Sequence, residues 1–426
     1  MEKRTTWGDW KLRRNLHVHD GNSRRFTLLS GMVALLDVSA LTQARGRRMS
    51  VYITSTGRFL PGPAIPVDEV EKVLGAVHGK PSSLRVQIQK ANKIQTRHYA
   101  IDEQQQTTHS NTEMAAKAAE ECLDRAFVGR EKVGMLAVAS TQGDLPAPGM
   151  ASMVQAELDL PEIEILTTHG ICSSSIMALK AAWNSMRLDE HEAALVLSSE
   201  LASRLLKKQR YEAATTSTFA AKRIDFSTEF LRWMLSDGAG ALLLQNKPAP
   251  KGLSLRIDWI RGFSHAHALP TCMSVGSAGR PEDTRTWQDY DTYAEAEQDG
   301  ALLLRQDVRL LDNLMRMGVD GYLRLVEEGV SKPEDVDHFL CHYSSHHFRN
   351  KILEMLNKAG VGIPEEKWWT NLYTRGNTGC ASLFIMLDEF LRTDELSVNE
   401  GDRVLCFVPE SGRFNTTYLH FTVVSQ

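Results

Sequence analysis

The side chain in this sequence best suited to chemistry is a cysteine at the mouth of an expected helix. The stretch 163–187 passes from a short apolar run (Ile163, Ile165 and Leu166) through His169-Gly170 into a helical pattern, and Cys172 falls in its first turn. Unpaired backbone N–H groups and the helix dipole favour a thiolate at such a position. A thiolate attacks thioesters, so we expect Cys172 to be a nucleophile that forms an acyl-enzyme. The alternative is a buried, inert cysteine.

Two polar side chains further along the chain suit the stabilisation of negative charge. His342 lies in DHFLCHYSS and Asn377 in TRGNTGCAS. Two neutral donors aimed at one point stabilise an enolate oxygen, and an asparagine cannot act as a base. The pattern therefore favours oxyanion binding over proton abstraction. One alternative is that His342 is a core histidine whose hydrogen bonds are satisfied, or that the neighbouring His346 or His347 has been mistaken for it. The alternative for Asn377 is a Gly-Asn turn that only ends a strand.

Alternating strands and helices are expected to position these residues. Apolar runs predict buried strands, and a stripe of apolar residues predicts that the helix after Cys172 is central (Ile176, Leu179, Trp183 and Met186). This indicates a parallel-rich α/β sheet covered on both faces. A second cycle of the same plan begins near residue 253 and brings Asn377 to the front of another apolar helix. We therefore expect Cys172 and Asn377 to face a common point.

Two irregular stretches, 201–233 and 262–300, are too long for simple connections. Such excursions commonly cap active sites, so we expect them to shape a substrate tunnel. The alternative is surface decoration.

Cys172, His342 and Asn377 in this order, with WMLSDGAGALLL at 233–244, resemble the motifs of the beta-ketoacyl-acyl-carrier-protein synthase III family of the thiolase superfamily. The resemblance runs from Met49 to the C-terminus. It implies a thiolase-like fold of two similar α/β halves, packed as layered αβαβα around buried central helices. The expected divisions are a basic extension at 1–48, a half with Cys172 at 49–250, and a half with His342 and Asn377 at 251–426.

The family implies a ketosynthase III-like acyltransferase. Acyl-Cys172 would be condensed, by a decarboxylative Claisen step, with a malonyl- or beta-keto-thioester in lipid, fatty acid or polyketide biosynthesis. His342 and Asn377 would be the enolate oxyanion donors. Alternatives are acyl transfer to an oxygen or nitrogen nucleophile, condensation followed by cyclisation, and a non-catalytic partner subunit. Such subunits typically lack the cysteine, which argues against the last.

Further sites follow from the same resemblance. A second oxyanion hole would use the N–H of Cys172 and one from the turn 409–412, at Gly412, although Glu410 and Ser411 depart from the family's glycine run. Ala147 stands where short-chain members carry a phenylalanine, which leaves room for a longer acyl chain. The family's tryptophan for coenzyme A is absent from the basic stretch, where four residues are weaker candidates for carrier phosphates: Arg85, Lys90, Lys93 and Arg97. A solvated basic face is the alternative.

The charge distribution and the cysteines of the chain indicate where the protein works and with which partners. The chain has 426 residues and a net charge of −4, but residues 1–48 carry ten Lys/Arg against four Asp/Glu. That leader is a transit-like segment, an arm for an acidic partner, or sequence before a natural start at Met49. Six scattered cysteines without metal-ligand spacing favour a reduced, cytoplasmic protein. We expect a homodimer that uses acyl carrier protein or coenzyme A thioesters, with no metal, redox cofactor, nucleic acid or membrane span.

Overall fold

Each half of the chain builds five strands in the same order. The computed structural model describes residues 49–214, 226–279 and 284–426, so the predicted extension lies outside the described residues. In the first half the order is β5 (Glu164–His169), β4 (Val133–Ser140), β6 (Ala193–Glu200), β7 (Gly238–Gln245) and β1 (Tyr52–Phe59). In the second half it is β12 (Trp368–Trp369), β11 (His338–Cys341), β13 (Arg403–Glu410), β14 (Asn415–Val424) and β8 (Ser254–Ser264).

The strand directions match as well. The first three strands of each set are parallel, and the last two are antiparallel to their neighbours. A short antiparallel pairing of β1 with β8 joins the sets into one sheet of ten strands. The sheet is thus mixed rather than dominated by parallel pairs.

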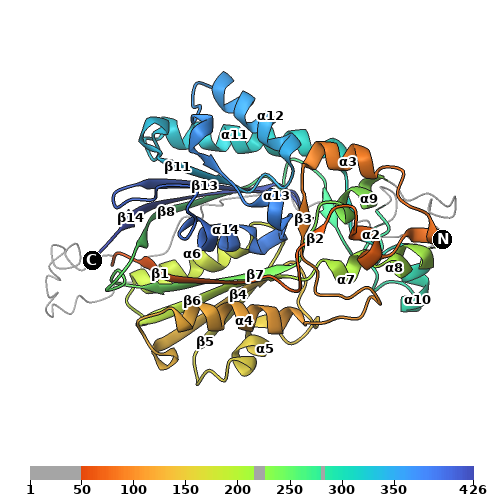
Figure 1. The fold of residues 1–426 in the computed structure, drawn as a ribbon, viewed down its shortest axis with the longest axis horizontal. Coiled ribbons are helices and arrows are strands. Elements are labelled where there is room, and N and C mark those ends of the chain that lie inside the picture. The colour runs from red at the N-terminus through yellow and green to blue at the C-terminus, as the bar shows by residue number, and fades with distance from the viewer. Residues whose placement is uncertain (1–48, 215–225, 280–283) are drawn as a thin grey trace, which may run out of the picture. The chain divides into compact units, whose positions relative to one another are not determined.

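Helices cover and separate the two sets of strands (Figure 1). Between them lie the central helices α6 (Ser174–Arg187) and α14 (Ser382–Phe390). One outer face carries α4 (Asn111–Asp124) and α5 (Met150–Glu157); the other carries α11 (Leu311–Glu327) and α12 (His346–Lys358). The predicted αβαβα layering is confirmed.

Most of the shorter helices and strands that Figure 1 labels lie at one end of the layers, on its right. The remaining described α-helices and strands are β2 (Ile65–Pro66), α2 (Val70–Leu74), α3 (Arg85–Asn92), β3 (Thr96–Arg97), α7 (Ser203–Leu206), α8 (Lys208–Ala213), α9 (Phe226–Arg232), β9 (Met273–Ser274), α10 (Tyr293–Gln298), β10 (Arg305–Gln306) and α13 (Leu372–Arg375).

Apolar packing fixes the two central helices. The stripe predicted on α6 is buried, with Ile176 and Leu179 fully enclosed, and it shares a core with Phe384 and Phe390 of α14. Gly240 of β7 makes this approach possible, because a Cβ there would lie 2.5 Å from the Cβ of Phe384. Close packing of α14 on β7 is thus the physical reason for a glycine in the SDGAGA motif.

The strand that leads to Cys172 is not buried as predicted. Ile165 is 41% exposed, and every residue of β5 is exposed or half-buried. The cause is its position, since β5 pairs with β4 and stands at the edge of the sheet in the described part of the chain. A short apolar run has the same appearance in a central strand and in an edge strand, so the sequence did not distinguish them.

Candidate active site

The nucleophile candidate lies in the turn between β5 and α6. Ser173 is the N-cap residue of α6, and Cys172 directly precedes it, 8% exposed. The Ser173 backbone N–H and hydroxyl both donate to the Glu410 carboxylate, at 3.1 and 2.5 Å. The carboxylate thus binds the end of the helix that orients Cys172.

This environment does not favour a thiolate. Burial raises the pKa of Cys172, and the charges of Glu410 and Glu200 raise it further. The net shift of this pKa is therefore upward, the opposite of the lowering expected from a helix N-terminus alone. The sequence places a helix N-terminus beside the sulfur, but it does not show that a distant carboxylate has taken that position.

Asn377 stands at the corresponding turn of the second half, between α13 and α14. Its backbone is fixed by an N–H bond to the Met234 carbonyl at 3.1 Å and by Ser236 N–H, which donates to its carbonyl at 2.8 Å. Its side-chain Oδ1 accepts from the Gly379 N–H at 3.0 Å. With the oxygen engaged in the turn, the Nδ2 amide remains as the donor, as the predicted role requires.

His342 follows β11 directly. It is 4% exposed, and its backbone N–H donates to the Phe407 carbonyl at 2.9 Å. Burial lowers the pKa of His342 to about 4, so the imidazole is neutral near pH 7. Its Nε2 is buried and finds no hydrogen-bond partner among the described residues. His342 itself is not among the residues that line the pocket described next, and the donor role of its Nε2 stays a prediction.

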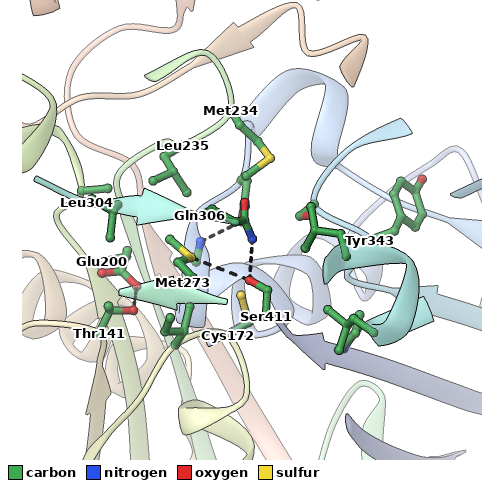
Figure 2. A pocket seen from close by; sticks show the side chains of 18 of the residues that line it. Thr141, Cys172, Glu200, Met234, Leu235, Met273, Leu304, Gln306, Tyr343 and Ser411 are labelled. Atoms are coloured by element: carbon green, nitrogen blue, oxygen red, sulfur yellow. Dashed lines mark hydrogen bonds between the residues drawn. The ribbon is translucent and has the colours of Figure 1, made fainter. Parts of the chain in front are cut away.

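One pocket, with a cavity volume of about 50 Å³, brings the two turns together (Figure 2). Cys172 and Asn377 both line it, as expected, and so do Tyr343 and Ser344, the two residues after His342. Its apolar wall comes mainly from Leu, Met, Ile and Phe side chains: Ile171, Leu201, Leu205, Met234, Leu235, Met273, Leu304, Leu311, Leu314, Met315 and Phe348. Several belong to the two irregular stretches, which therefore shape the pocket.

Glu200 is a pocket residue that the sequence reasoning missed. It ends β6 and is 6% exposed; its Oε2 accepts from Thr141 Oγ1 at 2.6 Å and from the Cys380 N–H at 3.3 Å. Burial raises the pKa of Glu200 to about 7. The available signal was a charged residue closing the apolar strand AALVLSSE.

Glu200 and Glu410 occupy equivalent places, because β6 and β13 are equivalent strands. Glu200 of the first half holds the turn before α14 of the second half, through the Cys380 N–H. Glu410 of the second half holds the turn before α6 of the first, through the Ser173 N–H. Each half therefore fixes the reactive turn of the other.

Asp237 has a structural role. It binds three groups through two oxygens, namely the Ala100 N–H and the N–H and hydroxyl of Ser203. These bonds tie β7 to two distant segments. The glycines that follow Asp237 lie in β7 itself, so this motif is the start of a strand and not a turn.

The turn after β13 contributes differently from the prediction. Pro409 and Ser411 line the pocket, whereas the Gly412 carbonyl accepts from the N–H groups of Cys272 and Met273. These bonds dock β9 onto the turn. The oxyanion role of the Gly412 N–H stays a prediction.

The predicted carrier residues divide into two groups. Arg85, Lys90 and Lys93 lie on or just after α3 with side chains at least partly exposed. Arg97 is wrong as a phosphate contact, because it is fully buried and donates to the Trp233 carbonyl at 2.9 Å. In a basic stretch, sequence alone does not show which residue turns inward at a strand.

Ala147 is exposed in the loop between β4 and α5 and is absent from the pocket wall of its own chain. Asp144 anchors this loop to the start of α4 by accepting from the Thr112 N–H and hydroxyl, at 2.8 and 2.6 Å. The influence of Ala147 on acyl length stays a prediction.

Comparisons with known proteins agree with this geometry. Residues 326–412 match the family "3-Oxoacyl-[acyl-carrier-protein (ACP)] synthase III C terminal", and residues 150–249 match "Beta-ketoacyl synthase, N-terminal domain". The two matches fall on the segments that carry the asparagine and the cysteine. This chain is related to the beta-ketoacyl-acyl-carrier-protein synthase III enzymes. The resemblance inferred from its motifs is confirmed.

Individual relatives of the synthase III group are distant. Beta-ketoacyl-[acyl-carrier-protein] synthase III of Streptococcus uberis is 23% identical over 299 residues, which cover 70% of this chain and 80% of the relative. The structure of AbyA1, described as a tetronic acid condensing enzyme, superposes with a TM-score of 0.69 at 18% identity, covering 87% of this chain and 99% of AbyA1. Xanthomonas campestris OleA, solved with lauric acid and lauroyl-CoA, gives 0.67 at 19% identity, covering 88% and 99%. These structures share the thiolase-like fold.

Proposed function

We propose that this protein is a ketosynthase III-like acyltransferase that forms acyl-Cys172 and condenses it with a second thioester in lipid or secondary-metabolite biosynthesis. One observation carries the proposal. Cys172 and Asn377, which precede the two central helices, line the same apolar pocket in a relative of the synthase III enzymes.

Acylation exchanges one thioester for another. The Cys172 sulfur attacks the thioester carbonyl carbon, the bond to the donor sulfur breaks, and the Cys172 proton leaves with the departing thiol. Because the pKa of Cys172 is raised, a base must relay that proton. Glu200, with a pKa near 7, is a pocket-lining group suited to do so at neutral pH. The N–H groups of Cys172 and Gly412 are proposed to hold the oxyanion.

Condensation then requires a carbon nucleophile. Loss of carbon dioxide from a malonyl thioester leaves its electron pair as an enolate, whose oxygen accepts hydrogen bonds from His342 Nε2 and Asn377 Nδ2. The enolate carbon attacks the acyl carbonyl, and the Cys172 thiolate departs. A histidine held neutral by burial donates here without moving a proton. These steps use protein side chains and need no metal or redox cofactor.

The pocket wall indicates an apolar acyl group. Leu and Met side chains gain most by covering a hydrocarbon chain. We further propose that Ala147 leaves space for a long chain, and that Arg85, Lys90 and Lys93 attract the phosphates of acyl carrier protein or coenzyme A.

A homodimer is part of the proposal. Among the strands that the structure describes, β5 pairs on one side only. Exposed apolar side chains lie on it and on neighbouring segments: Ile165 (41%), Met177 (43%) and Leu145 (49%). We expect Ile165→Lys to shift the mass measured by light scattering from dimer to monomer, whereas Tyr293→Lys on α10 keeps the dimer. A monomeric wild type would contradict this part of the proposal.

We also propose a cytoplasmic location, since all six cysteines are buried and free. No helix in the described ranges is long and apolar enough to cross a bilayer.

Condensation followed by cyclisation is the second candidate function, suggested by the likeness to the condensing enzyme AbyA1. Product analysis with a defined acceptor separates the two, and also separates transfer to an oxygen or nitrogen nucleophile.

Intact-protein mass tests the central claim. The wild type is incubated with short to long acyl thioesters on coenzyme A and on carrier protein, beside Cys172→Ala and, as a matched control, Cys122→Ala. Cys122 is also buried, at 0% exposed against 8% for Cys172, but it lies on α4 next to β1 and does not line the pocket. We expect an acyl adduct in the wild type and Cys122→Ala and none in Cys172→Ala. No adduct from any donor would overturn the acyl-enzyme and favour a partner subunit.

A further inference from the structure

Gln306 is an unexpected residue in the wall of an apolar pocket. It ends the short strand β10, which pairs with β9 so that Gln306 lies opposite Met273. Its side chain lines the pocket and is 3% exposed. Burying an amide in apolar surroundings is unfavourable unless each polar atom finds a partner.

One end of this amide is satisfied. Gln306 Nε2 donates to Ser411 Oγ at 2.7 Å, and the Ser411 hydroxyl points on to the Met273 sulfur at 3.7 Å (Figure 2). Ser411 belongs to the turn that docks on β9 and lines the same pocket as Cys172. These contacts fix the direction of the carboxamide.

The other end is not. Gln306 Oε1 is buried and has no hydrogen-bond partner in the part of the chain that the structure describes. Among pocket-lining side chains within the described ranges, it is the one buried polar atom left without a partner. Glu200, by contrast, has Thr141 and Cys380 as donors. Gln306 Oε1 is therefore an acceptor in the pocket without a donor among the described residues.

We propose that Gln306 Oε1 accepts a hydrogen bond from an O–H or N–H group of the thioester substrate and so selects substrates that carry a donor. The inference rests on the proposed function, since it takes the pocket as the thioester site. Two sources supply such a group: a hydroxyl on the acyl chain, or an amide of a pantetheine arm. The apolar wall binds hydrocarbon of any kind, whereas this single acceptor distinguishes among substrates of equal length.

Binding, rather than turnover, tests the inference, so its outcome is independent of catalysis. Titration calorimetry at pH 8 on Cys172→Ala would use decanoic acid, 3-hydroxydecanoic acid and decanoyl-CoA. Ionised decanoic acid carries no hydrogen-bond donor, 3-hydroxydecanoic acid carries a hydroxyl, and the pantetheine arm of decanoyl-CoA carries amides. Each is measured again with Gln306→Met, which keeps the length of the side chain, and with Leu304→Met, which places the same new side chain on a neighbouring pocket residue.

We expect Gln306→Met to lower the affinity for a donor-bearing ligand about tenfold more than the affinity for decanoic acid. That factor corresponds to about 1.4 kcal/mol of binding free energy. Leu304→Met is expected to change all three affinities by one common factor. A selective loss for 3-hydroxydecanoic acid identifies the acyl hydroxyl, and a selective loss for decanoyl-CoA identifies the pantetheine amide.

Equal changes for all three ligands in Gln306→Met, or no binding of any of them, would overturn the inference. Thermal melting of each variant confirms the fold. Failure of acylation in the mass experiment would instead refute the proposed function, so the two failures are distinguishable.

Discussion

Replacing Glu410 by glutamine isolates the electrostatic effect of one carboxylate on Cys172. The carboxylate accepts from the Ser173 N–H and hydroxyl at the front of α6, and its charge raises the pKa of the neighbouring thiol. A glutamine carbonyl still accepts at the same place, so Glu410→Gln keeps the contact and removes the charge.

The size of the effect follows from Coulomb's law. Two unit charges about 6 Å apart interact by roughly 2.8 kcal/mol at an effective dielectric constant of about 20. Glu410 is only partly buried, and solvent screening at least halves this to about 1.4 kcal/mol, one pKa unit. The thiolate fraction of Cys172 should then rise about tenfold at any pH below the pKa of the thiol.

Alkylation by iodoacetamide between pH 6 and 9, followed by the mass of the Cys172 peptide, measures that fraction. We expect the log rate to rise with pH in both proteins, less steeply near pH 7 where Glu200 ionises, and to be displaced upward about tenfold in Glu410→Gln. Glu334→Gln makes the same charge change at an exposed site and should follow the wild type. An unchanged or slower rate in Glu410→Gln would refute the electrostatic reasoning.

Three other predictions follow from the packing and the charges. Asn377→Ala should retain acylation by mass but lose condensation by roughly a hundredfold or more, and equal loss of both would contradict its oxyanion role. Gly240→Ala should lower the free energy of unfolding by about 3 kcal/mol, measured by urea denaturation, because its Cβ would overlap Phe384; a change below about 0.5 kcal/mol would contradict this. The pKa of Glu200 is raised to about 7, which means that the folded protein binds this proton more tightly than the unfolded chain does. The contribution of Glu200 to the free energy of unfolding therefore falls as the pH rises from about 4.5 to 7. Glu200→Gln lacks this loss, and its stability relative to wild type should improve between pH 5 and 8 by up to roughly 3 kcal/mol; a pH-independent difference would contradict the assignment.

The sequence predicted the features that depend on local order. The strand, turn and helix around Cys172, the turn and helix at Asn377 and the central α6 stripe were visible as periodicity and motif. Contacts between distant segments were not. Glu410 meets Ser173 across 237 positions, and Glu200 meets Cys380 across 180. Nothing local indicates either contact, and for the same reason the raised pKa of Cys172 and the burial of Arg97 could be seen only in the fold.

Because a carboxylate of each half binds the reactive turn of the other, the geometry of the site depends on how the two halves pack together. The turn of Cys172 is held by a residue of the second half, and the turn before α14 by a residue of the first. A small slip of one half against the other would therefore lengthen hydrogen bonds at both turns at once. The geometry of the site therefore depends on the interface between the halves, and we expect core substitutions where α6 meets α14 to alter the chemistry by shifting that interface.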